Sequence, residues 1–256
     1  MNTPKITDAM WSGWMGKLLY VPLLNILILL YVYIPGQDLG LAIIAITLLI
    51  RIFLHPSYRT TLKAQRDMQK IQPYIDKLKV EFKDDQKRQS EEMMKLYKEH
   101  KVNPLGSCLP LIIQLPIVFA LYRVFIAGLD TSSLVHLYSW FPNPPEQLHT
   151  IFLAFTNISS LAIDLTTRNI YLAIAAGLAQ LLQTVVTMRR TSGAAKKQST
   201  LMMVFPVVTF GLALTLPSAL SLYWAVTTLI MTLEQLWVFA ILDRQEKKVI
   251  EETHHG

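Results

Sequence analysis

Five long apolar stretches, separated by polar segments, dominate the hydrophobic pattern of this chain. A helix needs about 20 mostly apolar residues to cross the hydrocarbon core of a bilayer, and each stretch has close to that length. The stretches are Leu39–Pro56, Leu105–Ala127, Asn169–Met188, Thr200–Leu216 and Ala219–Leu242. The pattern predicts an all-α membrane protein with a core of five transmembrane helices.

The polar segments between these stretches complete the predicted organisation. In order, the expected parts are an N-terminal tail and helix (1–37), a first span (38–57), a cytosolic antiparallel helical hairpin (58–104), a second span (105–128), an extracytoplasmic interfacial loop (129–168), a third span (169–189), a cytosolic loop (190–199), a fourth span (200–216), a fifth span (218–242) and a cytosolic basic tail (243–256). Pro217-Ser218 joins the last two spans in a tight turn.

The stretch Leu18–Ile34 allows two interpretations. It is interrupted by Pro22 and Asn25 and is rich in tyrosine. Because amphipathic rings favour headgroup depth, we prefer an N-terminal interfacial helix. The alternative is a sixth, short span flanked on the inside by Lys5 and Lys17.

The hairpin segment has the pattern of two packed helices. Its apolar residues recur at spacings of three and four, which is typical of one helix packing against another; they are Met68, Ile71, Ile75, Leu78 and Phe82. The polar run Lys83–Gln86 supplies a turn. Pro73 is expected to break the helix that leaves the membrane, because proline lacks a backbone N–H.

The distribution of positive charge predicts the orientation. The chain is 52% hydrophobic and only 16% charged, with a formal net charge of +6. A cytosolic hairpin places 19 of the 24 Lys and Arg residues inside, in segments 59–101, 189–197 and 244–248, as the positive-inside rule requires. Positive charge therefore follows topology, which argues against nucleic acid as a direct partner. No signal or transit peptide is evident, so we expect a bacterial plasma membrane protein.

The outer loop is expected to be irregular and to dip into the membrane interface. It contains Trp140 and Phe141, three nearby prolines, and the apolar run Ile151–Phe155. A spanning hairpin within 134–165 is disfavoured, because it would invert the charge bias of every later segment.

One cation, Arg51, lies inside an apolar stretch. An arginine near the middle of a spanning helix costs about 2.5–3.5 kcal/mol on insertion scales, so it usually faces a cavity or a partner. Position alone also allows snorkelling to the headgroups, since Pro56 is only five residues away. Polar side chains at depth favour a hydrated, positively charged pocket open to the cytosol; they are Thr47, Gln114, Gln180, Gln183, Thr184, Thr227, Thr228, Glu234 and Gln235.

The sequence carries no motif for covalent chemistry. It has no P-loop, GxSxG or HExxH motif. Cys108 is alone, so neither a disulfide framework nor a CxxC metal pair is expected. We therefore predict a non-enzyme with no catalytic residue, metal or other cofactor. A positive hydrated pocket suits hydrophilic, often acidic, segments on their way across a membrane.

Three other functional classes are weighed against this one. A transporter or channel predicts internal repeats with paired broken helices, and no repeat is visible. An intramembrane enzyme needs a catalytic pair within the spans, and the sequence shows no Ser/His, Asp/Asp or metal-binding cluster there. A pure scaffold would have no need of Arg51, so replacing this residue would leave its function unchanged.

Three segments resemble bacterial YidC insertases of the YidC/Oxa family. They are Lys83–Phe125, which includes NPLGSCLPLIIQLPI, then Thr47–Arg51, and Leu216–Trp224; the similarity covers about residues 16–245. The resemblance implies an insertase that accepts nascent membrane-protein segments in a hydrophilic groove and releases them into lipid. It assigns groove positions to Arg51, Thr47, Gln114 and Trp224, and we add Tyr223 and Gln183 as candidates.

The resemblance also implies partners and some differences. The partners are nascent membrane proteins, the Sec translocon, the lipid bilayer and the ribosome, and the core is expected to function as a monomer. Because the basic tail is short (Arg244, Lys247 and Lys248), we expect only weak ribosome binding. We expect neither the large outer domain of Gram-negative relatives nor a lipoprotein-type cysteine. Thr228 stands where asparagine is common, so that role is not carried over.

Overall fold

The computed structural model describes residues 16–103, 109–127, 134, 136–153, 162–189 and 203–254. Cys108 and the expected cytosolic loop 190–199 lie outside the described residues. The elements are η1 (Gly16–Tyr20), α2 (Val21–Tyr33), α3 (Leu39–Glu81), α4 (Gln86–Glu99), α5 (Leu109–Ala127), β1 (Ile151–Phe152), β2 (Ile163–Asp164), α6 (Ile170–Arg189), α8 (Val204–Thr215) and α9 (Ser218–His254).

The described part of the chain is mainly helical. Four helical stretches are long and apolar enough to cross a membrane, namely Gly16–Tyr33, Leu39–Glu81, Ile170–Arg189 and Ser218–Gln245. Two further apolar helical stretches, Ile113–Ile126 and Val204–Thr215, are shorter. These lengths and compositions agree with a membrane protein that has several apolar helices.

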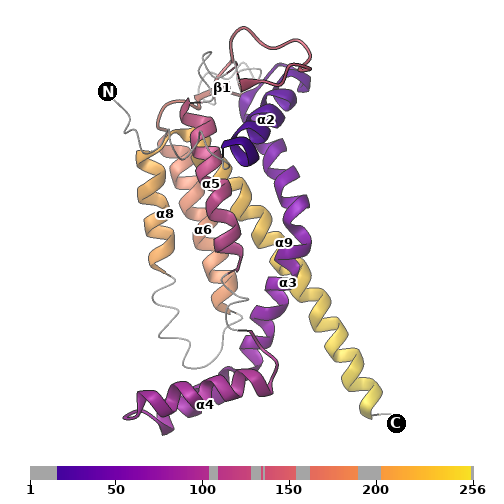
Figure 1. Ribbon diagram of the computed structural model, residues 1–256, viewed down its shortest axis with the longest axis vertical. Helices are drawn as coiled ribbons and strands as arrows, with labels where there is room; N and C mark the ends of the chain where they lie inside the picture. Colours follow the sequence, from indigo (N-terminus) through magenta and orange to yellow (C-terminus); the bar gives the residue numbers. More distant parts are fainter. Residues whose placement is uncertain are drawn as a thin grey trace.

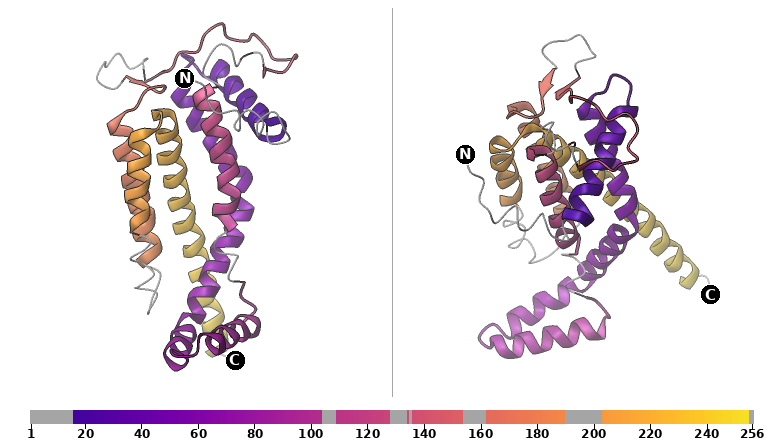
Figure 2. Two further views of the ribbon diagram at one scale, coloured as in Figure 1. Left: turned by 60° about the vertical axis from the view of Figure 1, so that its left-hand side comes forward. Right: turned by 45° about the horizontal axis from the view of Figure 1, so that its top comes forward.

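The apolar helices form a bundle (Figure 1). Helix α6 packs against both α8 and α9, and α9 packs in turn against α3. In the left view of Figure 2, α9 lies between the α6–α8 pair and the α3–α5 pair. We call the end of the bundle beside α2 and β1 the loop end, and the end beside α4 the hairpin end.

Helix α3 runs without a break through Pro56 and Pro73. The expected helix break at Pro73 is therefore wrong. Proline removes one hydrogen bond and bends a helix rather than ending it when the flanking residues stay helical. Figure 2 shows the lower part of α3 bending away from the bundle. One helix thus carries both the first apolar stretch and the first arm of the polar segment.

Helix α4 folds back along the end of α3. The Nε2 of Gln89 donates to the carbonyl oxygens of Lys79 at 3.3 Å and of Phe82 at 3.4 Å. Of the five apolar residues expected to form the seam, Ile71 and Ile75 are buried, each with 3% exposure. No residue of α4 is buried, so this part of the chain is held by few contacts.

Three polar side chains fasten the outer loop to the loop end. Asn25 of α2 donates to the carbonyl of His136 at 3.2 Å and accepts from the N–H of Tyr138 at 2.8 Å. The hydroxyl of Tyr31 accepts from the N–H of His149 at 2.8 Å. Asp38 caps α3 through the N–H of Leu41 and also accepts from the N–H of Leu153 at 2.7 Å.

The loop also contains a small antiparallel ribbon in which Ile151 pairs with Asp164 and Phe152 with Ile163. The expectation of a purely helical fold missed this ribbon. Strands of two residues leave no alternating pattern long enough to detect in a sequence. Asn25 interrupts an apolar run in the sequence, and its two hydrogen bonds to the outer loop explain why a polar residue stands there.

Asn25→Leu is expected to loosen the outer loop. Leucine keeps the approximate volume but removes the partner of the His136 carbonyl and of the Tyr138 N–H, and a typical hydrogen bond contributes about 0.5–1.5 kcal/mol. Hydrogen exchange at Tyr138 should accelerate. Ile26→Leu, on an exposed position of the same helix, is the control. Unchanged exchange in Asn25→Leu would show that the side chain does not hold the loop.

The loop end of the bundle is densely packed with apolar side chains. At this end, apolar residues of α3, α5 and α9 have exposed fractions of only 0% to 2%. They include Leu39, Ile43, Ile46, Leu121, Val124 and Leu220. Gly40 lies in the same region, and a Cβ atom there would be 2.0 Å from Cδ2 of Phe152. Only glycine therefore allows β1 to approach α3 this closely.

Candidate functional site

Arg51 lies inside the bundle, not at its surface. Its side chain comes from α3 and the residue is 5% exposed. The Nε atom donates to Oγ1 of Thr227 at 2.8 Å, and Nη2 donates to Oε1 of Gln114 at 3.0 Å. The guanidinium carbon also lies 5.9 Å from the centre of the Tyr58 ring. These contacts hold the cation between α3, α5 and α9 and exclude the snorkelling interpretation.

A chain of polar contacts extends from Arg51 to the neighbouring helices. The Nε2 of Gln114 donates to the hydroxyl of Tyr223 at 2.5 Å, so one glutamine links the arginine to α9. A second polar group lies between α6 and α9, where Nε2 of Gln183 donates to Oε1 of Gln235 at 2.9 Å. The hydroxyl of Thr232 donates to Oε1 of Gln183. Amide and hydroxyl groups that are buried in this way are satisfied by one another.

A cavity of about 320 Å³ adjoins both polar groups. One water molecule needs about 10–15 Å³ of such space, so the cavity can hold several. Its polar lining comes from α3, α5, α6 and α9, and comprises Arg51, Tyr58, Gln65, Gln114, Gln180, Gln183, Thr187, Tyr223, Thr227 and Thr228. Its apolar lining comprises Leu115, Val118, Phe205, Leu220, Trp224 and Met231. We call this cavity the groove.

The positive charge in the groove has no ion-pair partner among the described residues. Glu234, the nearest acidic candidate by type in the sequence, instead contacts the Nδ1 atom of His55. Neutral hydroxyl and amide oxygens therefore accept two hydrogen bonds from Arg51 without cancelling its charge. Since a buried cation is expensive in a medium of low dielectric, the groove should attract a negatively charged or strongly polar ligand.

Five of the six residues expected in the groove line it. They are Arg51, Gln114, Gln183, Tyr223 and Trp224. Thr47 does not line it: the residue is fully buried, and its hydroxyl donates at 2.6 Å to the carbonyl oxygen of Ile43 in its own helix. Thr47 lies one turn from Arg51 toward the loop end, where the apolar side chains of Ile43 and Leu121 are fully buried.

Sequence reasoning missed Tyr58 and Gln65 and did not select Thr227 for the groove. Arg51, Tyr58 and Gln65 are spaced by seven residues, which places them on one face of α3. That spacing was a usable signal. Because the sequence predicts that the span ends at Pro56, Tyr58 and Gln65 fall in the expected polar hairpin and not in the groove.

Comparison with known proteins gives a consistent result. The family model described as 60Kd inner membrane protein matches residues 29–246. A membrane protein insertase YidC of Nitratidesulfovibrio vulgaris is 32% identical over 242 residues, which is 93% of this chain and 40% of that protein. The YidC of Geobacter sulfurreducens is 30% identical over 238 residues, covering 92% of this chain and 40% of that protein.

A solved structure is similar as well. It is described as an active YidC insertase crystal structure with the first transmembrane domain resolved, and it matches with a TM-score of 0.54 and 27% identity. The match covers 90% of this chain and 46% of that one. The chain spans about 40% of the length of the two YidC proteins from Nitratidesulfovibrio vulgaris and Geobacter sulfurreducens. The resemblance predicted from three sequence segments is confirmed over most of the chain, which belongs to the YidC/Oxa family of inner membrane proteins.

Proposed function

We propose that this chain is a membrane protein insertase that accepts polar segments of nascent membrane proteins in the groove and releases their apolar segments into lipid. The observation that carries the proposal is the burial of Arg51 beside a cavity of about 320 Å³, with neutral hydrogen-bond partners and no ion pair among the described residues. A hydrated positive chamber lowers the desolvation cost of an acidic or hydrophilic passenger segment. Such a step requires no nucleophile and no cofactor.

The packing of the loop end supports an insertase over a channel. A channel needs a polar path through the whole bundle. Beyond the groove, the apolar side chains of α3 and α5 are almost completely buried; Ile43, Ile46, Leu121 and Val124 are each at most 1% exposed. A client segment that enters the groove therefore meets a packed apolar layer. It can leave laterally, between helices into the lipid, without a rearrangement of that layer.

Two apolar walls flank the groove and provide a lateral route into lipid. Leu115, Phe119, Tyr122 and Ile126 of α5 recur at helical spacing and are each between 39% and 53% exposed. On α8, exposed apolar side chains include Val204, Phe205, Val208 and Leu212. Leu115 and Phe205 also line the groove. An apolar passenger segment at this opening would exchange water for side chains and lipid, which is favourable.

The proposed topology follows the bias of positive charge. We place the hairpin end and the end of α9 in the cytosol, since segments 59–101, 189–197 and 244–248 hold most of the Lys and Arg residues. The five-helix core then consists of the apolar part of α3, α5, α6, α8 and the first part of α9, and α2 lies at the outer interface. The proposed partners are nascent membrane proteins, the Sec translocon and, weakly, the ribosome, with a monomeric core.

Site-specific photocrosslinking tests the proposal. A photoreactive amino acid at Gln114 or Trp224 should crosslink to ribosome-bound nascent chains of a single-span client, because both side chains line the groove. Phe53 is the matched control, since it is on α3, is 81% exposed and does not line the groove. Equal crosslinking from all three positions would indicate contact through lipid alone and would refute a groove-based mechanism.

A further inference from the structure

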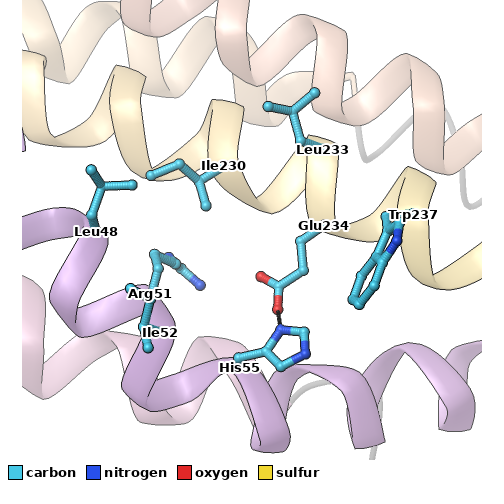
Figure 3. Close-up of a pocket in the computed structure, with 8 residues that line it drawn as sticks. All are labelled: Leu48, Arg51, Ile52, His55, Ile230, Leu233, Glu234 and Trp237. Carbon is cyan, nitrogen blue, oxygen red and sulfur yellow. Dashed lines mark hydrogen bonds and ion pairs between the residues drawn. The ribbon is translucent and has the colours of Figure 1, made fainter.

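A second cavity, larger than the groove, lies between α3 and α9 (Figure 3). Its volume is about 510 Å³. The apolar part of its lining is Leu48, Ile52, Ile230, Leu233 and Trp237. Arg51 borders both this cavity and the groove, so it stands in the partition between them. We call this second cavity the seam cavity.

The seam cavity faces outward from the bundle. Ile52 is 70% exposed, Leu233 is 67% exposed and Trp237 is 56% exposed. Large apolar side chains with this exposure are solvated by hydrocarbon when their helices cross a membrane. A concave apolar site of this size fits a flexible hydrocarbon chain better than the flat surface of a packed helix would.

The acidic side chains near the hairpin end of the seam cavity are already paired. His55 of α3 contacts Glu234 of α9, and the histidine side chain is 36% exposed whereas that of the acid is 9% exposed (Figure 3). The carboxylate is therefore shielded behind the imidazole. Asp243, the next acid along α9, pairs with Arg66 at 2.7 Å. Both acidic side chains described on this part of α9 are thus already engaged.

Two exposed cations follow His55 along the same side of α3. Arg59 and Lys63 follow at intervals of four residues and are both exposed, which places them one and two turns further toward the hairpin end. Leu39 and His55 are separated by about 24 Å along the helix axis at 1.5 Å per residue, against a hydrocarbon core of about 30 Å. His55 therefore falls about 6 Å inside this boundary, whereas Arg59 and Lys63, one and two turns further along α3, fall at or beyond it.

We propose that the seam cavity binds an anionic phospholipid of the leaflet at the hairpin end. One acyl chain occupies the apolar cavity between α3 and α9, and the phosphate lies against Arg59 and Lys63 beside the His55 imidazole. Basic side chains at the cytosolic ends of spanning helices form such headgroup sites when an apolar recess adjoins them. This inference requires that α3 and α9 cross the membrane, but it does not depend on the insertase function.

Quenching of Trp237 by brominated lipids tests the site. The full chain, with its other four tryptophans replaced by phenylalanine, is titrated in mixed micelles with dibrominated phosphatidylglycerol or dibrominated phosphatidylcholine. Half-maximal quenching should occur at about five-fold less phosphatidylglycerol than phosphatidylcholine, which is the size of effect expected from basic groups at a headgroup. Arg59→Gln combined with Lys63→Gln should abolish this preference.

Lys77→Gln combined with Lys79→Gln is the matched control, because it removes the same charge from exposed positions lower on α3 and should keep the preference. Equal quenching by the two lipids in the parent would overturn the proposal and leave only an ordinary lipid-facing surface. The absence of quenching by either lipid would overturn it in favour of a protein segment covering the cavity. A preference that survives Arg59→Gln and Lys63→Gln would refute the headgroup assignment.

Discussion

Arg51→Ala is expected to reduce the insertion of single-span clients with acidic translocated tails by about tenfold, which corresponds to about 1.4 kcal/mol. The substitution removes a buried positive charge that has no ion-pair partner among the described residues. Two opposite charges about 4 Å apart attract each other by about 4 kcal/mol at an effective dielectric constant of 20. Water in the groove would weaken that attraction, so we expect a smaller loss. Protease protection of newly made clients in a depletion strain measures the effect.

Two further variants separate the charge of Arg51 from its hydrogen bonds. Arg51→Lys keeps the charge but not the planar donor arrangement, and it should retain most of the insertion activity. Thr227→Val removes the acceptor at 2.8 Å from Nε while leaving the charge in place, and it should have a small effect. More than one client should be tested, including one with a neutral tail. Full activity of Arg51→Ala on all acidic-tailed clients would exclude an electrostatic role for the groove.

Gly40→Ala is expected to destabilise the protein by about 1–3 kcal/mol, the usual range for overpacking a buried contact. The new Cβ atom would lie 2.0 Å from Cδ2 and 2.4 Å from Cγ of Phe152. Phe152 is only 8% exposed, so its ring has little room to move aside. Since alanine favours helices over glycine by about 1 kcal/mol, any loss of stability must come from the clash. Unfolding in detergent by denaturant titration measures it.

A double substitution tests whether contact with Phe152 causes the loss of stability in Gly40→Ala. In a Phe152→Ala background the clash is absent, so Gly40→Ala should become neutral or stabilising through its helix propensity. Gly211→Ala is the matched control in α8, where an added Cβ atom meets nothing within 4 Å. If Gly40→Ala destabilises both backgrounds equally, close approach of β1 is not the reason for glycine at this position.

Several features of the protein could be predicted from the order of its residues. Hydropathy located the apolar helices, because a segment that crosses hydrocarbon must satisfy its backbone internally and present apolar side chains for about 20 residues. The cost of burying a cation marked Arg51 as exceptional before any contact was known. Gln114 and Gln183 stand out in the sequence as polar side chains within apolar stretches, whereas the family resemblance assigned Trp224 to the groove and Tyr223 was an added candidate. Family membership followed from short motifs and is confirmed by the comparisons.

Other features depended on which helices become neighbours. Arg51 and Thr227 are separated by 176 positions, and no periodicity within one helix shows that they touch. The same holds for His55 and Glu234 and for Gly40 and Phe152. Thr47 and Arg51 share a face of α3, yet a packed layer covers the threonine and leaves the arginine beside a cavity.

The sequence by itself determined which segments are apolar enough for lipid and that one of them carries a cation. Hydrophobicity and charge are properties of single residues, so they can be read along the chain. Tertiary structure alone decided that the cation lies between two cavities, which partners satisfy it, and where the polar space ends. Those outcomes depend on helix rotation and packing, in which residues far apart in the chain compete for the same volume.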